Sequence, residues 1–389
     1  MMRVLHLTTS FGFGGAETNL LRLVCGMDSS RFANTVVSMT DAQLLPSRLA
    51  DANVPFHSLG MFRSIPDPVA VIRFFRIIRR VRPDILQTWM YHADLLGLLV
   101  GKLARVPTIV WNLRCSSMDM TRYRWTSSLV LRSLVPLSRY PDAVLANSEA
   151  GIRFHKILGY RSRQWKLIPN SLDLDQFRPD SRAPAWLRRE LKLDLNAIVI
   201  GLIARYDPMK DHENFIAAAR LLASRIPSAH FVLVGWKVDA GNTALTRLME
   251  SSQLTHRFHL LGLRRDINHI TAGLDVACSS SAYGEGSSNA VAEAMACGVP
   301  CVVTNVGDSA LLLGKAGKIV PPKDPQALAR ACQEIAAMRP EERRWLGAYA
   351  RQRIQERCSM PAVVARYEAL YEQLGSNLKR EIQPLVRRA

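Results

Sequence analysis

Short apolar segments alternate with segments of helical periodicity along the first half of the chain. Apolar and β-branched runs predict strands at residues 3–8, 35–39, 84–89, 108–113 and 143–147. Between them, residues 16–26 and 69–81 repeat apolar positions at helical spacing. Strands that alternate with helices are typical of a parallel sheet built from βαβ units, so we predict an α/β domain at residues 1–170.

The same alternation begins again in the second half, after a polar, proline-containing interval at residues 169–184 that we predict to be a linker. New strands are predicted at residues 198–203, 230–234, 258–261, 274–278 and 300–304. They indicate a second parallel sheet, in a domain of residues 171–360. The remaining segment, 361–389, begins with a helical stripe of apolar residues, which predicts a helix that packs back across the domains.

The composition supports two folded domains. The chain has 389 residues, of which 48% are hydrophobic and 22% charged, and this excludes a disordered chain and exceeds the usual size of one domain. The net charge of +18 is uneven, because residues 1–170 hold 22 lysines and arginines against 10 aspartates and glutamates, a net of +12. The first domain should therefore attract an anion; charge alone leaves phospholipid, a diphosphate-linked molecule and nucleic acid open.

Cysteine usage and hydropathy predict a cytoplasmic protein. The seven cysteines are odd in number, and the closest pair, Cys297 and Cys301, lacks the spacing of a zinc ribbon or a redox dithiol. Buried thiols in a reducing compartment are the favoured interpretation. Residues 1–10 lack the apolar core and cleavage site of an export signal. The most apolar long stretch, 95–111, is interrupted by two charges and a proline, so any membrane contact should be peripheral.

The most informative segment, residues 279–305, passes from a strand end through a glycine-flanked loop into a helix and then into a buried strand. Gly284 and Gly286 let the backbone approach a ligand closely. The residues that follow them, at 287–289, begin a helix whose free N–H groups and dipole favour an anion. A phosphate group would fit at this turn.

Two glutamates frame the same turn. Glu285 lies in the loop, where its carboxylate can accept hydrogen bonds from a sugar, and Glu293 lies about one turn inside the helix, where it can hold two adjacent hydroxyls such as those of a ribose. An isolated glutamate near a helix start would serve only the helix dipole. The glycines, the strand-loop-helix context and the spacing of the two glutamates favour a binding site instead.

A strand end at Arg205 is followed five residues later by Lys210 near a helix start. A guanidinium and an ammonium in this position are suited to neutralising a diphosphate as it leaves. Two solvated surface cations are the alternative, and without the glutamate segment the two interpretations would stand about even.

In this order and spacing, the residues resemble the family 4 retaining glycosyltransferases over nearly the whole chain. The resemblance is carried by GGAE at 14–17, the histidine of YHADLLG at 92, NS at 147–148, IPNSLDLDQF at 168–177, Arg205 with Lys210, VGW at 234–236, LLGLRRDI at 260–267 and the Glu285/Glu293 segment. It implies the GT-B fold, with two Rossmann-like domains that face a cleft.

The resemblance also implies a role for each matching residue. Catalytic roles fall to His92, Arg205, Lys210 and Glu285, of which Arg205 and Lys210 hold the donor diphosphate and His92 contacts the donor sugar. The expected donor-binding residues are Gly14, Gly15, Leu263, Arg264, Gly286, Ser287, Ser288, Asn289 and Glu293. Glu293 would hold the ribose, Leu263 and Arg264 would lie beside the base, and Gly14 with Gly15 would let the first loop approach the phosphates or the acceptor. A histidine that only caps its helix is the alternative for His92.

Two positions depart from the family pattern. Ser171 replaces the usual glycine after Pro-Asn, which would strain a positive φ. Trp236 and Lys237 stand where many relatives carry a glycine-rich loop, so the shape of this loop is expected to differ. Asp173 and Asp175 could be mistaken for a metal-binding pair, but their place in the linker motif favours a structural turn, and we predict no metal.

Basic segments in the first half could meet a membrane. Arg73, Arg76 and Arg80 share one face of the predicted helix at 69–82, which is either a solvated crossover helix or a membrane-surface helix. A second basic segment, 122–139, carries large apolar side chains at Trp125, Leu129, Leu131 and Leu134.

We therefore expect a retaining glycosyltransferase that moves a sugar from a nucleotide-diphosphate sugar to a hydroxyl of a lipid-linked saccharide in surface-polysaccharide biosynthesis, at the inner face of the cytoplasmic membrane. A UDP-sugar is favoured over a GDP-sugar as the donor. No cofactor, metal or nucleic-acid partner is expected. The alternatives are a nucleotide-sugar epimerase of the same fold and a nonenzymatic, basic membrane-binding protein.

Overall fold

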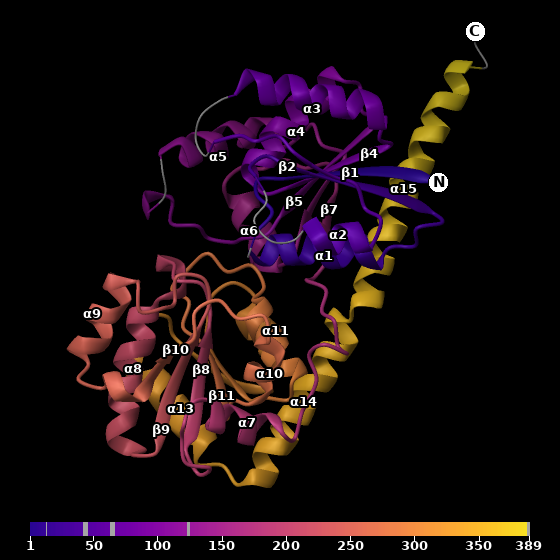
Figure 1. Cartoon of the computed structure of the whole chain (residues 1–389). Helices are drawn as coiled ribbons and strands as arrows, with labels where there is room; N and C mark the ends of the chain where they lie inside the picture. The colour runs from indigo at the N-terminus through magenta and orange to yellow at the C-terminus, as the bar shows by residue number, and fades with distance from the viewer. Residues whose placement is uncertain (13, 42–45, 63–66, 123–124, 387–389) are drawn as a thin grey trace. The chain divides into compact units, whose positions relative to one another are not determined.

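The computed structural model describes residues 1–12, 14–41, 46–62, 67–122 and 125–386 (Figure 1). The chain forms two compact units. Unit 1 holds Met1–Ser171 together with the C-terminal segment from Met360, and unit 2 holds Leu172–Ser359.

Unit 1 is built on a parallel sheet of seven strands in the order β3-β2-β1-β4-β5-β6-β7. Its strands are β1 (Met2–Thr8), β2 (Phe32–Ser38), β3 (Phe56–Ser58), β4 (Ile85–Trp89), β5 (Thr108–Leu113), β6 (Ala143–Ala146) and β7 (Trp165–Leu167). The order reverses between β1 and β4, which pair in parallel with Thr8 opposite Trp89. The loops after these two strands therefore diverge and leave a crevice at the carboxyl edge of the sheet.

Helices cover both faces of this sheet (Figure 1). The helices of unit 1 are α1 (Gly15–Gly26), α2 (Pro46–Asp51), α3 (Pro68–Val81), α4 (Tyr91–Leu103), α5 (Trp125–Leu137), α6 (Glu149–Ile157) and α15 (Met360–Val386), with a 3-10 turn at Met120–Arg122. Apolar side chains of α1, α2 and α15 pack on one face, and those of α3, α4 and α5 on the other.

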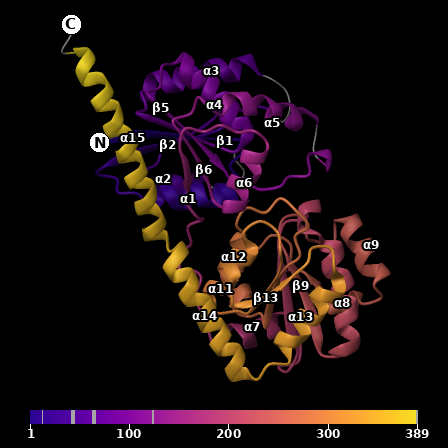
Figure 2. The same ribbon diagram turned by 180° about the vertical axis from the view of Figure 1, so that it is seen from behind.

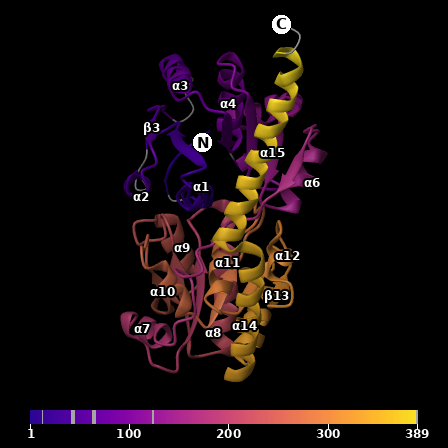
Figure 3. The same ribbon diagram turned by 90° about the vertical axis from the view of Figure 1, so that its right-hand side faces the viewer.

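The helix α15 completes the core of unit 1 although it is the last element of the chain (Figure 3). Its buried apolar stripe is the one the sequence predicts, and it includes Val363, Tyr367, Tyr371 and Leu374. Tyr371 donates a hydrogen bond of 2.7 Å to Gln87 Oε1 of β4, and Asn112 of β5 donates one of 3.1 Å to the Tyr367 hydroxyl. A buried polar group needs such a partner, so these contacts also fix how the helix lies on the sheet.

Unit 2 is built on a second parallel sheet, of six strands in the order β10-β9-β8-β11-β12-β13. Its strands are β8 (Ile198–Ile203), β9 (Ala229–Val234), β10 (Phe258–Leu260), β11 (Val276–Ser279), β12 (Cys301–Thr304) and β13 (Gly317–Val320). The strand order reverses between β8 and β11, so the crevice of this sheet lies between the loops that follow these two strands.

The helices of unit 2 form the layers on either side of its sheet (Figure 2). They are α7 (Ala183–Glu190), α8 (His212–Arg225), α9 (Thr243–Ser251), α10 (Ile267–Ala272), α11 (Asn289–Ala296), α12 (Ser309–Leu313), α13 (Pro325–Ala336) and α14 (Pro340–Cys358), with 3-10 turns at Pro208–Lys210 and Thr255–Arg257. Apolar residues of α8, α9 and α13 pack on one face, and those of α7, α10, α11, α12 and α14 on the other.

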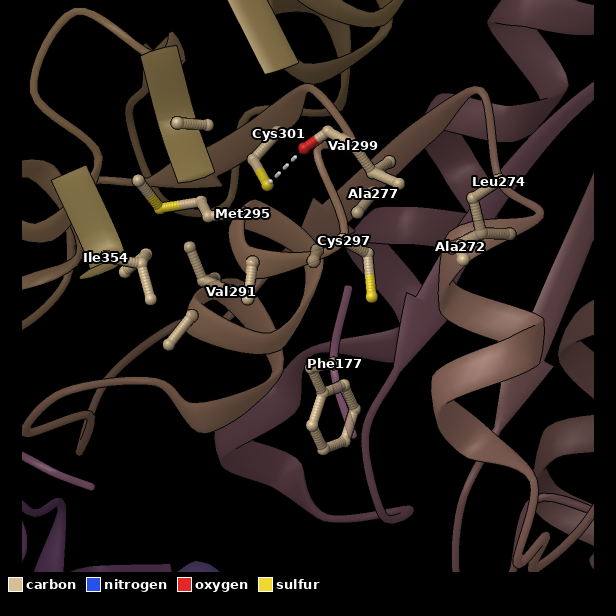
Figure 4. Close-up of a cluster of buried hydrophobic side chains, with 14 of the residues drawn as sticks. Phe177, Ala272, Leu274, Ala277, Val291, Met295, Cys297, Val299, Cys301 and Ile354 are labelled. Atoms are coloured by element: carbon tan, nitrogen blue, oxygen red, sulfur yellow. Dashed lines mark hydrogen bonds between the residues drawn. The ribbon is translucent and has the colours of Figure 1, made fainter. Parts of the chain in front are cut away.

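The interval at residues 169–184, predicted as a linker, contains the boundary between the two units after Ser171, and its remaining residues belong to unit 2. Leu172, Phe177 and Ala183 are buried in the core of unit 2, and Figure 4 shows the Phe177 ring beside Cys297. The Asp173 carboxylate accepts hydrogen bonds of 3.0 Å from the amides of Asp175 and Gln176, which is the structural turn that the sequence predicts. The polar composition of this interval therefore reflects its turns, although most of the interval packs on unit 2.

The expected α/β fold with two parallel sheets is confirmed, and all ten predicted strands are present. The edge strands β3, β7 and β13 were not predicted. The expected strain at Ser171 is wrong: Ser171 has no positive φ, and its amide donates a 2.8 Å hydrogen bond to Asn19 Oδ1. Among the described residues, no helix combines the length and apolar character needed to cross a bilayer.

Candidate active site

The candidate site of unit 2 lies at the carboxyl edge of its sheet, at the point where the strand order reverses. The loop after β8 carries Arg205 and Lys210, and the loop after the neighbouring strand β11 carries Glu285. Because both strands are parallel and adjacent, their loops meet at one edge. The structure thus brings together side chains that lie 75 residues apart in the sequence.

Lys210 and Glu285 form an ion pair at the centre of this site. The Lys210 ammonium donates to Glu285 Oε1, which also accepts a hydrogen bond of 2.7 Å from the Ser281 hydroxyl. Glu285 is only 5% exposed. Burial alone would raise the pKa of this carboxyl, but the charge of Lys210 and the hydrogen bonds from Lys210 and Ser281, with a further effect of Arg205, hold it below its ordinary value. Glu285 is therefore ionised near neutral pH.

Arg205 is held in place by its own loop. Its guanidinium contacts Asp207 Oδ2 through Nε at 3.1 Å and through Nη2 at 3.0 Å, and Nη2 also lies 3.5 Å from the Met209 sulfur. The other oxygen of Asp207 accepts a 3.0 Å hydrogen bond from the Met209 amide. The side chain of Arg205 remains partly exposed, so a fixed guanidinium faces the solvent beside the Lys210–Glu285 pair.

Backbone contacts join the loops after β8 and β11. The Ser280 hydroxyl donates a 2.8 Å hydrogen bond to the Lys210 carbonyl, and the Ala282 amide donates one of the same length to the Met209 carbonyl. The Thr304 hydroxyl, at the end of β12, donates a 2.7 Å hydrogen bond to the Ser281 carbonyl. Three strand ends therefore fix the geometry of the site before any ligand arrives, which reduces the cost of binding.

The start of α11 suits a phosphate group. Gly284 has a φ of +78°, which turns the loop toward the helix. Ser288, at the N-cap of α11, makes no side-chain hydrogen bond to the helix, whereas Asp211, Asn242 and Asp324 cap α8, α9 and α13 in this way. The start of α11 shares this lack of a side-chain cap with α7, α10 and α12, and among these helices it is the one that directly follows the loop of Glu285. Glu293, the fifth residue of α11, is half-buried one turn further along.

A glycine after β12 supports the site loop from behind. Gly307 has a φ of +60°, and a Cβ placed there would lie 2.0 Å from the Glu285 carbonyl oxygen. The amide of Asp308 donates a 2.8 Å hydrogen bond to the Gly286 carbonyl. The loop that holds Glu285 therefore rests directly on the backbone of Gly307, where only glycine fits.

Gly307→Ala should lower the free energy of unfolding by about 3 kcal/mol or more, because a methyl group there collides with backbone that cannot move aside. Gly298→Ala is the matched control: its φ is +72°, but its added Cβ would lie at an ordinary 3.4 Å from Pro179, so it should lose only about 1 kcal/mol. Urea unfolding of both variants measures the difference. Equal losses would show that Gly307 does not support the loop as described.

Arg264 and Leu263 follow β10 at the same carboxyl edge. The Arg264 guanidinium makes two hydrogen bonds to Asp266, of 2.8 and 2.7 Å, and one of 3.3 Å to Glu190, and these partners raise its pKa. Leu263 is exposed. The Gly235 amide donates a 2.8 Å hydrogen bond to the Gly262 carbonyl, which ties the loop after β9 to this one. The guanidinium of Arg264 is thus held by two carboxylates next to an exposed leucine in the sequence.

The other predicted residues, Gly14, Gly15 and His92, belong to unit 1, where they lie at the reversal point of its own sheet. Gly14 and Gly15 come after β1, and His92 is the second residue of α4, after β4. Gly14 leaves room for a carboxylate of its own helix, since a Cβ there would lie 2.1 Å from Glu17 Oε2. His92 is half-buried, and burial lowers its pKa, so the ring is neutral near pH 7.

Sequence reasoning missed the residues that hold the site in shape. Ser281 and Asp207 each bond to a predicted residue, and Gly307 touches the loop from another strand. The first two lie within four residues of Glu285 or Arg205, so proximity could have marked them. Gly307 carries no local signal, because its role depends on a contact between two loops.

Comparison with known protein families and solved structures shows which family this chain resembles. Residues 13–176 match the model described as Glycosyltransferase Family 4, and residues 197–338 match the model described as Glycosyl transferases group 1. In a structural comparison, HepE of Anabaena in complex with UDP and glucose superposes with a TM-score of 0.83 at 22% identity, over 96% of this chain and 100% of that one. At this identity the likeness shows the fold.

Two relatives of known name are similar in sequence. The UDP-Gal:alpha-D-GlcNAc-diphosphoundecaprenol alpha-1,3-galactosyltransferase of Escherichia coli is 27% identical over 77% of this chain and 81% of that protein. The N,N'-diacetylbacillosaminyl-diphospho-undecaprenol alpha-1,3-N-acetylgalactosaminyltransferase of Campylobacter jejuni is 26% identical over 62% of this chain and 65% of that protein. With a model match on each of its two units and the GT-B fold, the chain belongs to the family 4, group 1 glycosyltransferases.

Proposed function

We propose that this glycosyltransferase moves a hexose from a UDP-sugar to a hydroxyl of a lipid-linked saccharide, with retention of the anomeric configuration and without a metal ion. The observation that carries the proposal is the buried Lys210–Glu285 pair beside Arg205 and the start of α11. The names of both relatives include a diphosphoundecaprenol-linked acceptor, which supports a lipid-linked acceptor for this chain. The E. coli name and the HepE complex both include UDP, which supports a UDP-sugar as the donor.

In this proposal, the donor lies along the carboxyl edge of unit 2. Arg205, Lys210 and the amides of Gly286 to Asn289 bind the diphosphate, because they follow the adjacent strands β8 and β11 at one edge of the sheet and supply positive charge or N–H groups there. Glu293 accepts hydrogen bonds from the ribose hydroxyls, and Glu285 from the sugar. Leu263 and Arg264 contact the base. No cofactor takes part.

The chemistry follows from the charges of the site. Without a nucleophile of the enzyme, retention is best explained by attack of the acceptor hydroxyl on the face from which the diphosphate leaves. The C1–O bond to the diphosphate breaks, the new C1–O bond forms, and the acceptor proton passes to the leaving phosphate. Arg205 and Lys210 stabilise the negative charge that develops on that phosphate, which is the contribution a metal ion makes elsewhere. His92, being neutral, donates or accepts a hydrogen bond at the sugar.

Turnover of a panel of UDP- and GDP-sugars with a lipid-diphosphate saccharide, in excess EDTA, tests this proposal. We expect transfer from a UDP-sugar, an α-linked product from an α-linked donor by NMR, and a rate in EDTA equal to that with Mg²⁺. Inversion of configuration, or a rate lost in chelator and restored by Mn²⁺ or Mg²⁺, would refute the mechanism. Interconversion of the donor sugar without transfer would indicate an epimerase.

We also propose that unit 1 binds the inner face of the cytoplasmic membrane, where a lipid-linked acceptor is found. Its exposed surface combines arginines of α3 with large apolar side chains, of which Trp125 is 75% and Leu129 is 58% exposed, one turn apart on α5. Val69 and Ile72 of α3 are exposed as well. Leu131 and Leu134, in contrast, are buried in the core. An exposed tryptophan and leucine suit a membrane interface, and the net +12 of residues 1–170 would attract anionic lipid.

Trp125→Ser with Leu129→Ser should weaken binding to phosphatidylglycerol-containing vesicles at least tenfold, about 1.4 kcal/mol, because both side chains lose the apolar area they would insert. Trp345→Ser is the matched control, since Trp345 is 69% exposed but lies on α14 of unit 2. Co-sedimentation at low and high salt measures the binding, and high salt should release the wild type. Equal effects of both substitutions, or binding that salt does not change, would contradict the proposed surface.

A further inference from the structure

The turn that presents His92 is strained. Met90, between β4 and α4, has φ of +75° and ψ of 161°, a region that residues other than glycine rarely occupy. The turn persists because both of its sides are held: the Met90 amide donates a 3.2 Å hydrogen bond to the Asn112 carbonyl, and the Asp94 amide donates one of 2.9 Å to the Met90 carbonyl. Because this strained turn lies two residues before His92, the contacts that hold the turn also decide where the His92 side chain lies.

A side-chain hydrogen bond closes this turn. Thr88 of β4 and Asp94 of α4 lie on either side of Met90, and the distance from Thr88 Oγ1 to Asp94 Oδ1 is 2.5 Å. The helix can come this close because Gly97 follows one turn later: a Cβ there would lie 2.3 Å from the Thr88 methyl carbon. Both residues are fully buried, so this contact is part of the core of unit 1.

The distance between Thr88 and Asp94 fits either direction of donation, and the surrounding contacts decide it. Thr88 Oγ1 also lies 3.3 Å from the Val110 carbonyl oxygen, which can only accept. If Asp94 carries the proton, it donates to Thr88, and Thr88 donates to Val110, which leaves only the buried Oδ2 of a neutral Asp94 without a hydrogen-bond partner. If Asp94 is ionised, Oδ2 becomes part of a buried charge with no hydrogen-bond donor, which costs far more free energy than burying the same atom in a neutral acid.

The charges around Asp94 favour the same arrangement. Among the described side chains, the ionisable groups that act on it are Tyr91 of α4, Cys115 after β5 and Tyr160 after α6, and none is a cation at pH 7. Burial raises the pKa of Asp94 well above its ordinary value, more than the Thr88 hydroxyl and the Asn112 backbone lower it. The dipole of α4 favours an anion near its start, but this effect is small beside the cost of burying an uncompensated charge.

We propose that Asp94 is a neutral carboxylic acid that ties β4 to α4 through Thr88, and that it acts as a positioning residue for His92. The inference rests on the proposed function only for the role of His92. An acid that donates to Thr88 holds the first turn of α4 against the strain at Met90, so the ring of His92 keeps one place relative to the crevice of the sheet.

Steady-state kinetics of four variants test the role in positioning. Asp94→Asn preserves the shape and offers N–H donors, so kcat should stay within about threefold of the wild type, whereas Asp94→Leu should lower kcat more than about tenfold. Thr88→Val should lower kcat similarly, and Thr88→Ser should restore it. KM for the nucleotide sugar should change less than about twofold in all four, because the residues assigned to the donor diphosphate and ribose lie in unit 2.

Infrared difference spectra separate the two parts of the proposal. The wild type should show the carbonyl stretch of a protonated carboxylic acid that Asp94→Asn lacks, whether or not the enzyme turns over the chosen sugars. The absence of this band, or an Asp94→Asn variant as impaired as Asp94→Leu, would overturn the neutral acid. Thermal unfolding that falls in Asp94→Leu and Thr88→Val with kcat unchanged would overturn the positioning role. A wild type that shows the band but transfers no sugar would refute the proposed function and leave the neutral acid standing.

Discussion

Lys210→Met is expected to lower kcat by about a hundred- to a thousandfold, because it removes a preorganised cation from the phosphate that leaves. It should also lower the free energy of unfolding by about 3–5 kcal/mol, since Glu285 would then be a buried carboxylate without its cation. Product formation from a UDP-sugar and urea unfolding measure the two effects. A loss of both turnover and stability distinguishes a buried ion pair from a surface ion pair, because breaking a surface pair would lower the free energy of unfolding very little.

The double variant Lys210→Met/Glu285→Gln is the control. It removes both charges, so most of the stability should return while turnover stays low. The pair should also depend on pH: because the folded pKa of Glu285 lies below its ordinary 4.5, its stabilising effect is complete above that value and is lost as the pH falls through the folded pKa. A double variant as unstable as Lys210→Met would contradict the pairing. The pairing would also be contradicted if the stability of the wild type and that of Glu285→Gln changed in the same way from neutral to acid pH.

Glu293→Ala is expected to weaken the binding of free UDP at least tenfold. The proposed hydrogen bonds from the ribose hydroxyls to a carboxylate are charge-assisted, and each contributes about 1.5–3 kcal/mol, where about 1.4 kcal/mol corresponds to a factor of ten in affinity. The loss should appear even though free UDP carries no sugar. Calorimetric titration of the purified variant with UDP measures it.

Glu285→Gln serves as the comparison in the same titration. Glutamine keeps the shape and can still accept from Ser281, so UDP should bind nearly as well as to the wild type, while turnover falls steeply because the charge at the sugar is lost. If Glu285→Gln lost UDP affinity and Glu293→Ala kept it, the donor would lie in the reverse orientation and the assignment of the two glutamates would be wrong.

The sequence predicts the central strands of both sheets because those strands are buried on both faces and read as continuous apolar runs. β8 reads IVIGLI and was predicted with its full extent. The edge strands β3 and β7 read FHS and WKL, three residues each with a polar residue inside, and so short a run has no period to recognise. The interval at 169–184 was predicted as a linker and does contain the boundary between the units, but its packing on unit 2 could not be predicted, because turns and prolines look the same in a linker and in a segment that packs.

In the candidate site, too, the sequence predicts the positions along the chain but not the contacts between side chains. Arg205, Lys210, Glu285 and Glu293 stand in strand-loop-helix contexts, so their common edge could be predicted from the order of the elements. That Lys210 pairs with Glu285, and that Arg205 pairs with Asp207, could not, because the choice among nearby carboxylates depends on side-chain distances. Asp94 gave no signal either, as an aspartate in the first turn of a helix is ordinarily a solvated one.

The place of α15 in unit 1 has a consequence for the order in which the protein is made. Residues 1–171 leave the ribosome first, but α1 and α2 cover only part of the sheet face that carries Gln87 and Asn112, and the rest is covered when Tyr367 and Tyr371 arrive, after all of Leu172–Ser359. At usual rates of synthesis this interval lasts on the order of ten seconds or longer. Unit 2, whose residues are contiguous, can complete its core before unit 1 does. For that time the nascent chain displays the part of this apolar sheet face that α15 later covers, a surface of the kind that chaperones bind.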